Sequence, residues 1–252
     1  MQNEQRPAGD EYEISGEFLD LLIAPHWHAL APALQDALVG VDDTAGPVLD
    51  IGSGSGRALP MIDAVLSDAE IWASEPARTL RSILLATVAA SPRLRDKVTV
   101  IDHTPLAAAL PDSLSAVVAI NVIGHFTPTD RGRLWDLLAE RLAPGGRMVL
   151  NLQPPSTPEP VPETAPSSVH IGRRRYEGRG RAEVAGPDSV TWRMTYRVYH
   201  DEVLQAEHQV DYDWWVLNEA TLRSETTARG LRTMPVGPSD LAMYAIDRAR
   251  QA

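Results

Sequence analysis

Between residues 47 and 152, short apolar runs alternate with segments of helical periodicity. The apolar runs lie at 48–51, 71–74, 98–101, 115–121 and 147–152. The run at 115–121 is apolar almost throughout, which is typical of a strand covered on both faces. Helices are predicted between the runs, near 57–66, 77–90 and 130–142. This alternation with short turns predicts an α/β fold, a doubly wound parallel sheet with right-handed crossovers.

Two further regions depart from this alternation. Apolar residues from Ile14 to Leu30 recur at roughly helical spacing, interrupted by Pro25 and Pro32, and predict one or two amphipathic helices. After the last parallel strand, six prolines between residues 154 and 166 predict an extended loop. Period-two runs near 176–184, 192–198 and 204–214 then predict an antiparallel meander with one aromatic face and one wet face.

The end of the chain returns to the core pattern. Asn218 is expected to cap a helix that stops at Gly230, and strands are expected at 231–236 and 241–246. We therefore expect three parts. They are an N-terminal helical cap (1–46), a Rossmann-like core (47–153 and 217–252), and an inserted loop with antiparallel strands (154–216).

Composition excludes several classes of function. The net charge of −11 argues against a duplex-binding surface, which needs clustered Lys and Arg. The chain has no cysteine, so disulfides, thiolate metal sites and cysteine nucleophiles are excluded, and its seven histidines lack metal-binding spacing. Residues 1–11 look like a frayed terminus, and no apolar stretch approaches a membrane span. We therefore expect a cytoplasmic protein that binds neither nucleic acid, membrane nor metal.

Polar residues follow the predicted parallel strands. Asp50 and the glycine loop 52–56 follow the first strand, Glu75 the second, Asp102 the third and 121–125 the fourth. In an open α/β sheet, ligands bind beyond the carboxyl ends of the strands. A carboxylate after the second strand suits the hydroxyls of a ribose, and one after the third suits an exocyclic amine such as that of adenine.

The spacing of the glycines indicates which nucleotide-like ligand fits. The dinucleotide fingerprint G-x-G-x-x-G would need a glycine where this chain has Arg57. Asp50 beside the loop would repel a phosphate and matches an ammonium group. The sequence therefore favours a ligand with a ribose, an adenine and an amino-acid end, and disfavours a nicotinamide-dependent oxidoreductase.

The stretch Val-Leu-Asp-Ile-Gly-Ser-Gly-Ser-Gly at 48–56, with Glu75, Asp102, 121–125 and Ala-Pro-Gly-Gly-Arg-Met-Val-Leu at 143–150, resembles the class I S-adenosylmethionine-dependent methyltransferases. The resemblance covers roughly 47–152 plus the last two strands. It implies a Rossmann-like, mostly parallel sheet of seven strands with an antiparallel last strand. It also implies methyl transfer from S-adenosylmethionine to an O or N atom of a small molecule, in secondary metabolism, with S-adenosylhomocysteine as product. The cofactor-binding residues that it implies are Asp50, Gly52, Ser53, Gly54, Gly56, Glu75, Pro76, Asp102, His103 and Asn121.

His125 follows the fourth strand, where an acceptor would approach, and is the candidate catalytic base. A hydroxyl acceptor would need such a base, whereas a neutral amine needs only an oriented lone pair. The alternative for His125 is a ring packed at the strand–helix turn, and for His208 we expect a place in the core. Candidate acceptor contacts are Tyr12, His26, Trp27, His28, Trp192 and Tyr196. The alternative for the two histidines is plain solvent exposure, and for Trp27 it is packing on the core. For the aromatic residues of the meander the alternative, which we favour, is that they cover the sheet or a subunit interface.

Other functions stay open at this point. A protein of this fold could bind S-adenosylmethionine and catalyse a cyclisation, rearrangement or elimination without methyl transfer. A third hypothesis is a non-catalytic partner whose aromatic meander mediates assembly, and the same face predicts a homodimer. Neither the acceptor nor the atom methylated follows from the sequence, although a protein or nucleic-acid acceptor is disfavoured.

Overall fold

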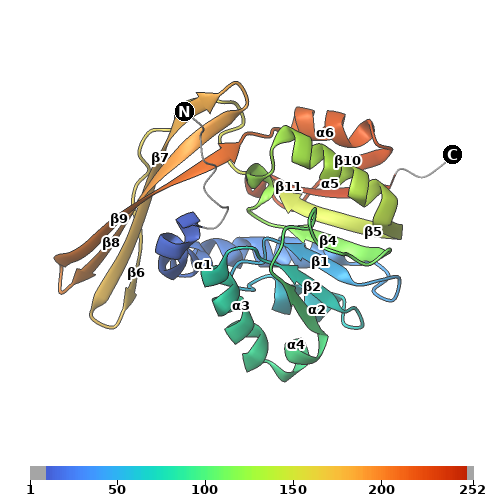
Figure 1. The fold of residues 1–252 in the computed structure, drawn as a ribbon, viewed down its shortest axis with the longest axis horizontal. Coiled ribbons are helices and arrows are strands. Elements are labelled where there is room, and N and C mark those ends of the chain that lie inside the picture. Colours follow the sequence, from blue (N-terminus) through green and yellow to red (C-terminus); the bar gives the residue numbers. More distant parts are fainter. Residues whose placement is uncertain (1–9, 249–252) are drawn as a thin grey trace.

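The computed structural model describes residues 10–248 and contains two sheets (Figure 1). The larger sheet has seven strands in the order β10-β11-β5-β4-β1-β2-β3. Its strands are β1 (Val48–Ile51), β2 (Ile71–Ser74), β3 (Val98–Ile101), β4 (Leu114–Ala119), β5 (Leu142–Asn151), β10 (Leu231–Val236) and β11 (Met243–Arg248). Strands β1 to β5 pair in parallel, and β11 runs antiparallel to both β5 and β10. The predicted doubly wound sheet is confirmed.

Both faces of this sheet are covered by helices. The helices are α1 (Asp10–Leu38), α2 (Leu59–Val65), α3 (Arg78–Ala90), α4 (Pro92–Lys97), α5 (Pro128–Arg141), α6 (Glu219–Thr227) and the 3₁₀ turns η1 (Ile123–His125) and η2 (Ser239–Leu241). Val48 packs in a hydrophobic cluster with α1 to α4, and Leu49 packs in the opposite cluster with α5 and α6. Because alternate strand residues enter different cores, the central strands are mostly apolar on both faces.

Helix α1 corrects the prediction of an interruption at the prolines. It is one helix of 29 residues that contains both Pro25 and Pro32. A proline in a helix interior costs roughly 3 kcal/mol, and packing at both ends of α1 opposes that cost. Its C-terminal half buries Leu34 and Leu38 in the main core, and its N-terminal half buries Phe18 against the second sheet. Residues 1–9 of the predicted frayed segment 1–11 lie outside the described residues. The helix begins at Asp10 and so includes the last two residues of that segment.

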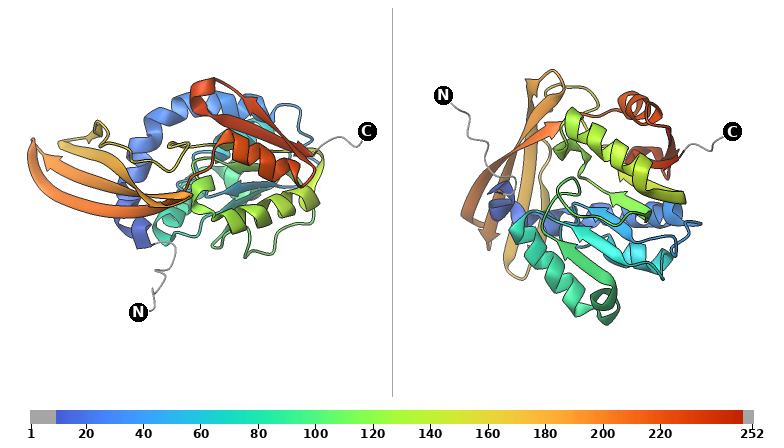
Figure 2. Two further views of the ribbon diagram at one scale, coloured as in Figure 1. Left: turned by 90° about the horizontal axis from the view of Figure 1, so that it is seen from above. Right: turned by 45° about the vertical axis from the view of Figure 1, so that its right-hand side comes forward.

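The second sheet contains β6 (Ser167–Ile171), β7 (Arg174–Gly186), β8 (Ser189–His200) and β9 (Val203–Trp215), all antiparallel in chain order. The sequence predicted the last three of these strands and missed β6. In Figure 2 this sheet extends away from the core beside α1. Its aromatic face packs on α1, where Phe18 stacks on Tyr196 with ring centroids 4.8 Å apart. His208 is exposed, which corrects its expected place in the core.

Two smaller predictions near β5 also change. Strand β5 begins at Leu142 and not at Arg147, and its pairing with β4 shifts register between Leu114 and Ala116. The segment Pro144-Gly145-Gly146 therefore forms an irregularity within the strand. Helix α5 begins at Pro128, two residues before the predicted start, and its cap is Thr127, whose hydroxyl accepts the Asp130 N–H. Neither change moves the carboxyl ends of the strands.

Candidate active site

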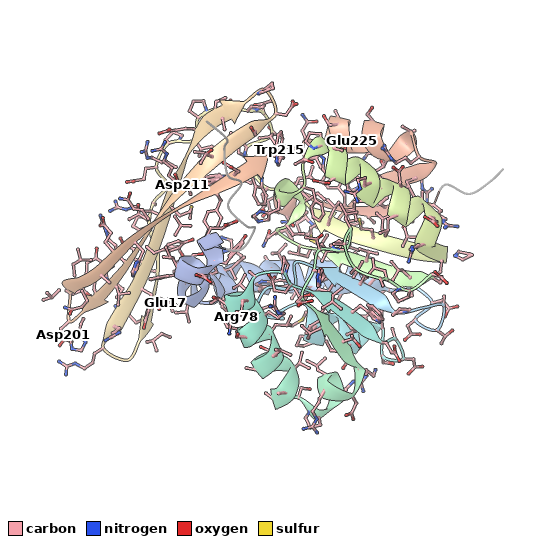
Figure 3. The ribbon with its side chains drawn as sticks, viewed as in Figure 1. Glu17, Arg78, Asp201, Asp211, Trp215 and Glu225 are labelled. Atoms are coloured by element: carbon pink, nitrogen blue, oxygen red, sulfur yellow. The ribbon has the colours of Figure 1, made fainter. Side chains whose placement is uncertain are left out.

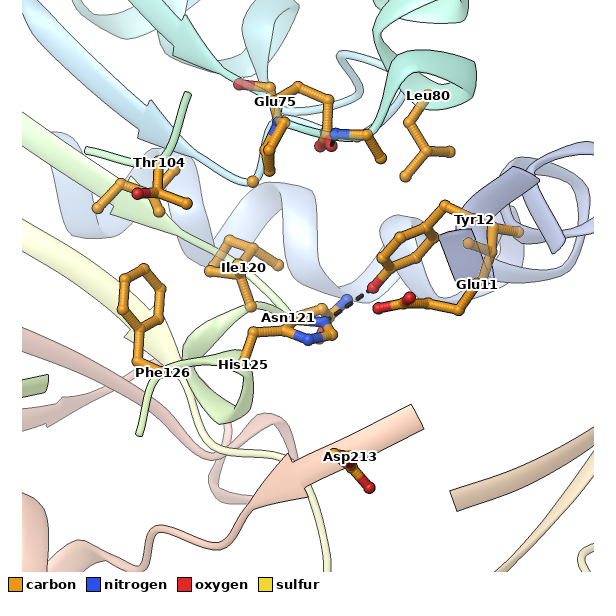
Figure 4. Close-up of a pocket in the computed structure, with 18 of the residues that line it drawn as sticks. Glu11, Tyr12, Glu75, Leu80, Thr104, Ile120, Asn121, His125, Phe126 and Asp213 are labelled. Carbon is orange, nitrogen blue, oxygen red and sulfur yellow. Dashed lines mark hydrogen bonds between the residues drawn. The ribbon is translucent and has the colours of Figure 1, made fainter. Parts of the chain in front are cut away.

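A cavity of about 1650 Å³ lies at the carboxyl ends of the parallel strands. One wall is the glycine loop with Glu75, and the opposite walls come from α1, η1 and β9 (Figure 4). Pockets for a single drug-sized ligand measure roughly 300–1,000 Å³. The cavity therefore has room for two ligands side by side.

The glycine loop follows β1 and has left-handed backbone at Gly52, Gly54 and Gly56, with φ of 64°, 57° and 87°. A Cβ on Gly52 would lie 2.5 Å from the Val122 side chain, and one on Gly56 would lie 2.9 Å from Leu84. A Cβ on Gly54 would meet only a backbone oxygen at 3.9 Å. Gly52 and Gly56 are thus required by packing as well as by φ, and Gly54 leaves the cavity side of the loop open.

Glu75 fastens this loop to the start of α3. Strand pairing aligns Ile51 with Ser74, so the loop and Glu75 leave the sheet side by side. The carboxylate accepts the N–H groups of Gly54 and Ala77, each at 2.8 Å. Burial raises the pKa of Glu75, while these two hydrogen bonds oppose the rise. Each carboxylate oxygen keeps a second lone pair, so Glu75 fits the ribose contact that the sequence assigned to it.

Asp50 lies under the loop and outside the cavity wall, and its contact with a ligand stays a prediction. It is only 3% exposed, and its Oδ2 has no hydrogen-bond partner among the described residues. Burial raises the pKa of Asp50 to about 7, and the neighbouring Glu75 carboxylate adds to the rise. The buried Asp50 side chain therefore packs beneath the glycine loop.

Asp102 and His103 are also absent from the cavity wall. Their side chains are exposed and pair with each other, with His103 Nδ1 2.5 Å from Asp102 Oδ1. The cavity at this end is lined by residues 104–107, directly after the predicted pair. The loop after β3 turns both polar side chains outward, so the adenine contact assigned to them is not formed by this arrangement.

His125 and Tyr12 meet on the far side of the cavity, although 113 residues separate them in the chain. The Tyr12 hydroxyl and Nε2 of His125 share a hydrogen bond of 2.8 Å (Figure 4). The imidazole also packs edge-on against Trp214, with centroids 5.0 Å apart. The ring is open to the cavity but has protein on most sides, and this desolvation lowers the pKa of His125 to about 4. Desolvation likewise raises the pKa of Tyr12 well above its usual value.

Asn121 stands beside this pair with a left-handed φ of 58°. Its backbone N–H donates to Oδ1 of Asn151, and its own Oδ1 accepts from Nδ2 of Asn151, both at 2.7 Å. This reciprocal pair holds the end of β4 against β5. Pro76 and Ser53 lie in the cavity wall as well, while Gly56 does not.

The remaining predicted acceptor contacts divide. Trp27 lines the cavity from α1, whereas His26 and His28 are exposed and lie outside the wall. Trp192 and Tyr196 belong to the hydrophobic packing of the second sheet and do not reach the cavity. The aromatic face of that sheet packs against α1, in agreement with the alternative that these side chains cover the sheet.

The sequence missed the polar face of the second sheet. Its residues in the cavity wall include Glu183, Thr191, Arg193, Gln209, Asp211 and Asp213. Figure 3 shows Trp215 where β9 approaches the core, Asp211 further along the strand and Asp201 at the far tip. Alternation along β9 identified this face as wet, but no sequence signal told which face would border a cavity.

Within the described residues, eight acidic side chains and three arginines line the cavity. No three histidine or acidic side chains among residues 10–248 gather into a metal-binding group. No helix in the same range is long and apolar enough to cross a membrane. The charged residues of the cavity wall are thus mostly acidic.

Comparisons with solved structures agree with this fold. DesVI from Streptomyces venezuelae superposes with a TM-score of 0.73 at 17% identity, covering 94% of this chain and 98% of its own. The amino pentose methyltransferase CalS10 from Micromonospora echinaspora, bound to S-adenosylmethionine, gives 0.71 at 16% identity, with 97% and 99% covered. The sugar N-methyltransferase KedS8 from Streptoalloteichus gives 0.70 at 16% identity, with 99% and 97% covered.

The sequence itself matches a family model. A search by sequence among curated proteins found no match. The model for a methyltransferase domain, however, matches residues 24–234, which is most of the chain. The resemblance seen in the glycine loop is thereby confirmed, and the chain belongs to the methyltransferase-domain family.

Proposed function

We propose that the chain transfers a methyl group from S-adenosylmethionine to a nitrogen or oxygen of a polar small molecule, with an amine as the favoured acceptor. The cavity carries this proposal, because one wall suits an adenosine-like ligand and the other is polar. When bound, the cofactor supplies an electrophilic methyl group on a sulfonium. The protein's part is then to align the acceptor and to exclude water.

The cofactor fits the residues at the glycine loop. Gly54 leaves space for the methionine part, and Glu75 retains lone pairs for ribose hydroxyls. A pyrophosphate would meet the Glu75 carboxylate at the same place. These contacts favour an adenosine with an amino-acid end over a dinucleotide.

The Tyr12–His125 pair favours an amine over a hydroxyl acceptor. Desolvation lowers the pKa of His125, which makes its imidazole a weaker base for removing the proton of an alcohol. The raised pKa of Tyr12 keeps its hydroxyl protonated as well. A neutral amine needs no base at the moment of transfer, and the pair can orient its lone pair by hydrogen bonds. The acidic wall also attracts amines in their protonated form, and such an amine must release its proton to water before its lone pair can attack the methyl group.

The structural neighbours support a class of acceptor within this proposal. KedS8 is a sugar N-methyltransferase and CalS10 is an amino pentose methyltransferase from calicheamicin biosynthesis. We therefore assign an amino sugar of secondary metabolism as the acceptor class. In this proposal α1 and residues 154–216 form the acceptor region around the 47–153 and 217–252 core. The homodimer and the cytoplasmic location stay predictions.

Calorimetry with S-adenosylhomocysteine tests the cofactor site. Replacing Glu75 by Gln should weaken binding by about 10- to 100-fold, because a hydrogen bond to a charged group contributes about 1.5–3 kcal/mol. Glu70→Gln is the matched control, since Glu70 is exposed and lies outside the cavity wall. Thermal melting checks that both variants fold. Failure of the wild type to bind S-adenosylhomocysteine would contradict the proposal.

A further inference from the structure

The amino-acid end of the proposed cofactor carries both an ammonium and a carboxylate. Removing such a zwitterion from water is costly unless each charge meets a partner of opposite sign. The proposed function therefore requires a cation and a carboxylate near the glycine loop. This inference rests on that function and asks which side chains supply the two charges.

Arg57 is the cation on the cofactor side of the cavity. Of the three arginines in the described wall, Arg133 lies on α5 beside Asp130 and Arg193 lies on β8 of the second sheet. Arg57 directly follows the glycine loop along which a methionine part would lie. Its side chain is 32% exposed, so it remains accessible to a ligand.

Asp20 of α1 holds Arg57 in place from one side. The guanidinium donates from Nε and Nη2 to the Asp20 carboxylate at 2.6 and 2.8 Å, and Nη2 also donates to the Asp20 carbonyl at 3.0 Å. The Ser55 hydroxyl donates to the same carboxylate. Nη1 donates to none of the described residues, so one edge of the fork is left for a second carboxylate.

Asp20 is also the acid positioned for the ammonium. Asp50, which the sequence assigned to this role, lies under the loop and outside the cavity. Asp20 lines the cavity and is 29% exposed, and its geometry is fixed by Arg57 and Ser55. Asp20 and Arg57 thus place a negative and a positive charge side by side, which is complementary to the ammonium and carboxylate of an amino acid.

We propose that Asp20 and Arg57 together bind the amino-acid end of the cofactor, Arg57 its carboxylate and Asp20 its ammonium. The site is then assembled from two elements, since Asp20 belongs to α1 and Arg57 to the loop before α2. Cofactor binding would stabilise the same α1 that carries Tyr12 into the acceptor side. Both residues would contact the cofactor directly.

Calorimetry with four ligands tests this assignment. The ligands are S-adenosylhomocysteine, its analogues lacking either the carboxylate or the amino group, and methylthioadenosine, which lacks the amino-acid end. Arg57→Gln should weaken S-adenosylhomocysteine about 10- to 100-fold and leave methylthioadenosine and the analogue without carboxylate within about twofold of wild type. Asp20→Asn should weaken S-adenosylhomocysteine but not the analogue without the amino group.

Arg229→Gln serves as control, because Arg229 pairs with Asp136 at 2.7 Å outside the cavity wall. It should bind all four ligands as the wild type does. Equal losses of S-adenosylhomocysteine and methylthioadenosine in Arg57→Gln would overturn the assignment, since they would reflect a disturbed loop. So would unchanged binding of S-adenosylhomocysteine in both variants. A wild type that binds none of the four would instead contradict the proposed function itself.

Discussion

Asp50 is buried beneath the glycine loop, and its Oδ2 accepts no hydrogen bond from residues 10–248. Burial raises its pKa from 3.8 to about 7, so the folded state holds the proton more tightly than the unfolded state. Stability contributed by the protonated form is complete below about pH 4 and is lost as the pH rises toward 7. The unfolding free energy of the neutral variant Asp50→Asn should therefore rise relative to that of the wild type as the pH increases from about 4 to 7.

Urea unfolding across that pH range measures the effect. The difference in unfolding free energy between Asp50→Asn and wild type should grow by at most about 1.4 kcal/mol per pH unit. Asp112→Asn provides the control, because Asp112 is exposed. Stability curves of Asp50→Asn and wild type that stay parallel from pH 4 to 7 would contradict the buried, protonated carboxylate.

Single residues also show where sequence reasoning succeeds and fails. Glu75 and the glycine loop were predicted because strands and helices alternate locally in the sequence and because glycine spacing marks a loop with left-handed backbone. Asp102 was assigned by the same rule, but the loop after β3 turns its side chain to solvent. Strand ends can therefore be found from sequence, whereas the direction of each side chain depends on the loop that follows.

At the scale of elements, η1 and β9 are joined at a point where only glycine fits. A Cβ on Gly124 would lie 1.9 Å from Cε2 of Trp214, a rigid ring that cannot yield as a flexible chain end does. Gly124→Ala should displace η1 and with it the neighbouring His125. We expect kcat/KM for the acceptor to fall by up to about 100-fold, because small misplacements near reacting groups are costly.

The matched control is Gly132→Ala in α5, where the added Cβ would meet only the terminal Nη2 of Arg229 at 2.9 Å. Affinity for S-adenosylhomocysteine should stay within about twofold in both variants, since neither glycine touches the glycine loop. Unchanged acceptor kinetics in Gly124→Ala would show that η1 does not position the reaction.

The second sheet explains why the acceptor side escaped prediction. Its alternation correctly gave an aromatic face and a wet face, but Trp192 and Tyr196 of the aromatic face were named as candidate acceptor contacts and no residue of the wet face was. Helix α1 covers that face through Phe18 and Tyr196, so the wet face borders the cavity. Which face a helix covers depends on long-range docking, and α1 itself was predicted as interrupted.

At the scale of the whole molecule, the cofactor side and the acceptor side differ in origin. The cofactor side is built from β1 and β2 and the segments that directly follow them. Its residues are therefore close in the chain and can be predicted from the sequence. The acceptor side joins Tyr12, His125 and Asp213, which lie far apart in the chain. The acidic residues of the cavity wall contribute to the net charge of −11. This negative charge agrees with an acceptor that is cationic when free in solution.

The most direct test of methyl transfer follows an isotope-labelled methyl group from S-adenosylmethionine. The protein is incubated with amino sugars and with matched sugars that carry a hydroxyl in place of the amine, and products are identified by mass spectrometry. We predict a labelled methyl on the amine nitrogen and an equal amount of S-adenosylhomocysteine, with the hydroxyl analogues unlabelled. Conversion of an acceptor without S-adenosylhomocysteine would contradict this account and favour a reaction without methyl transfer.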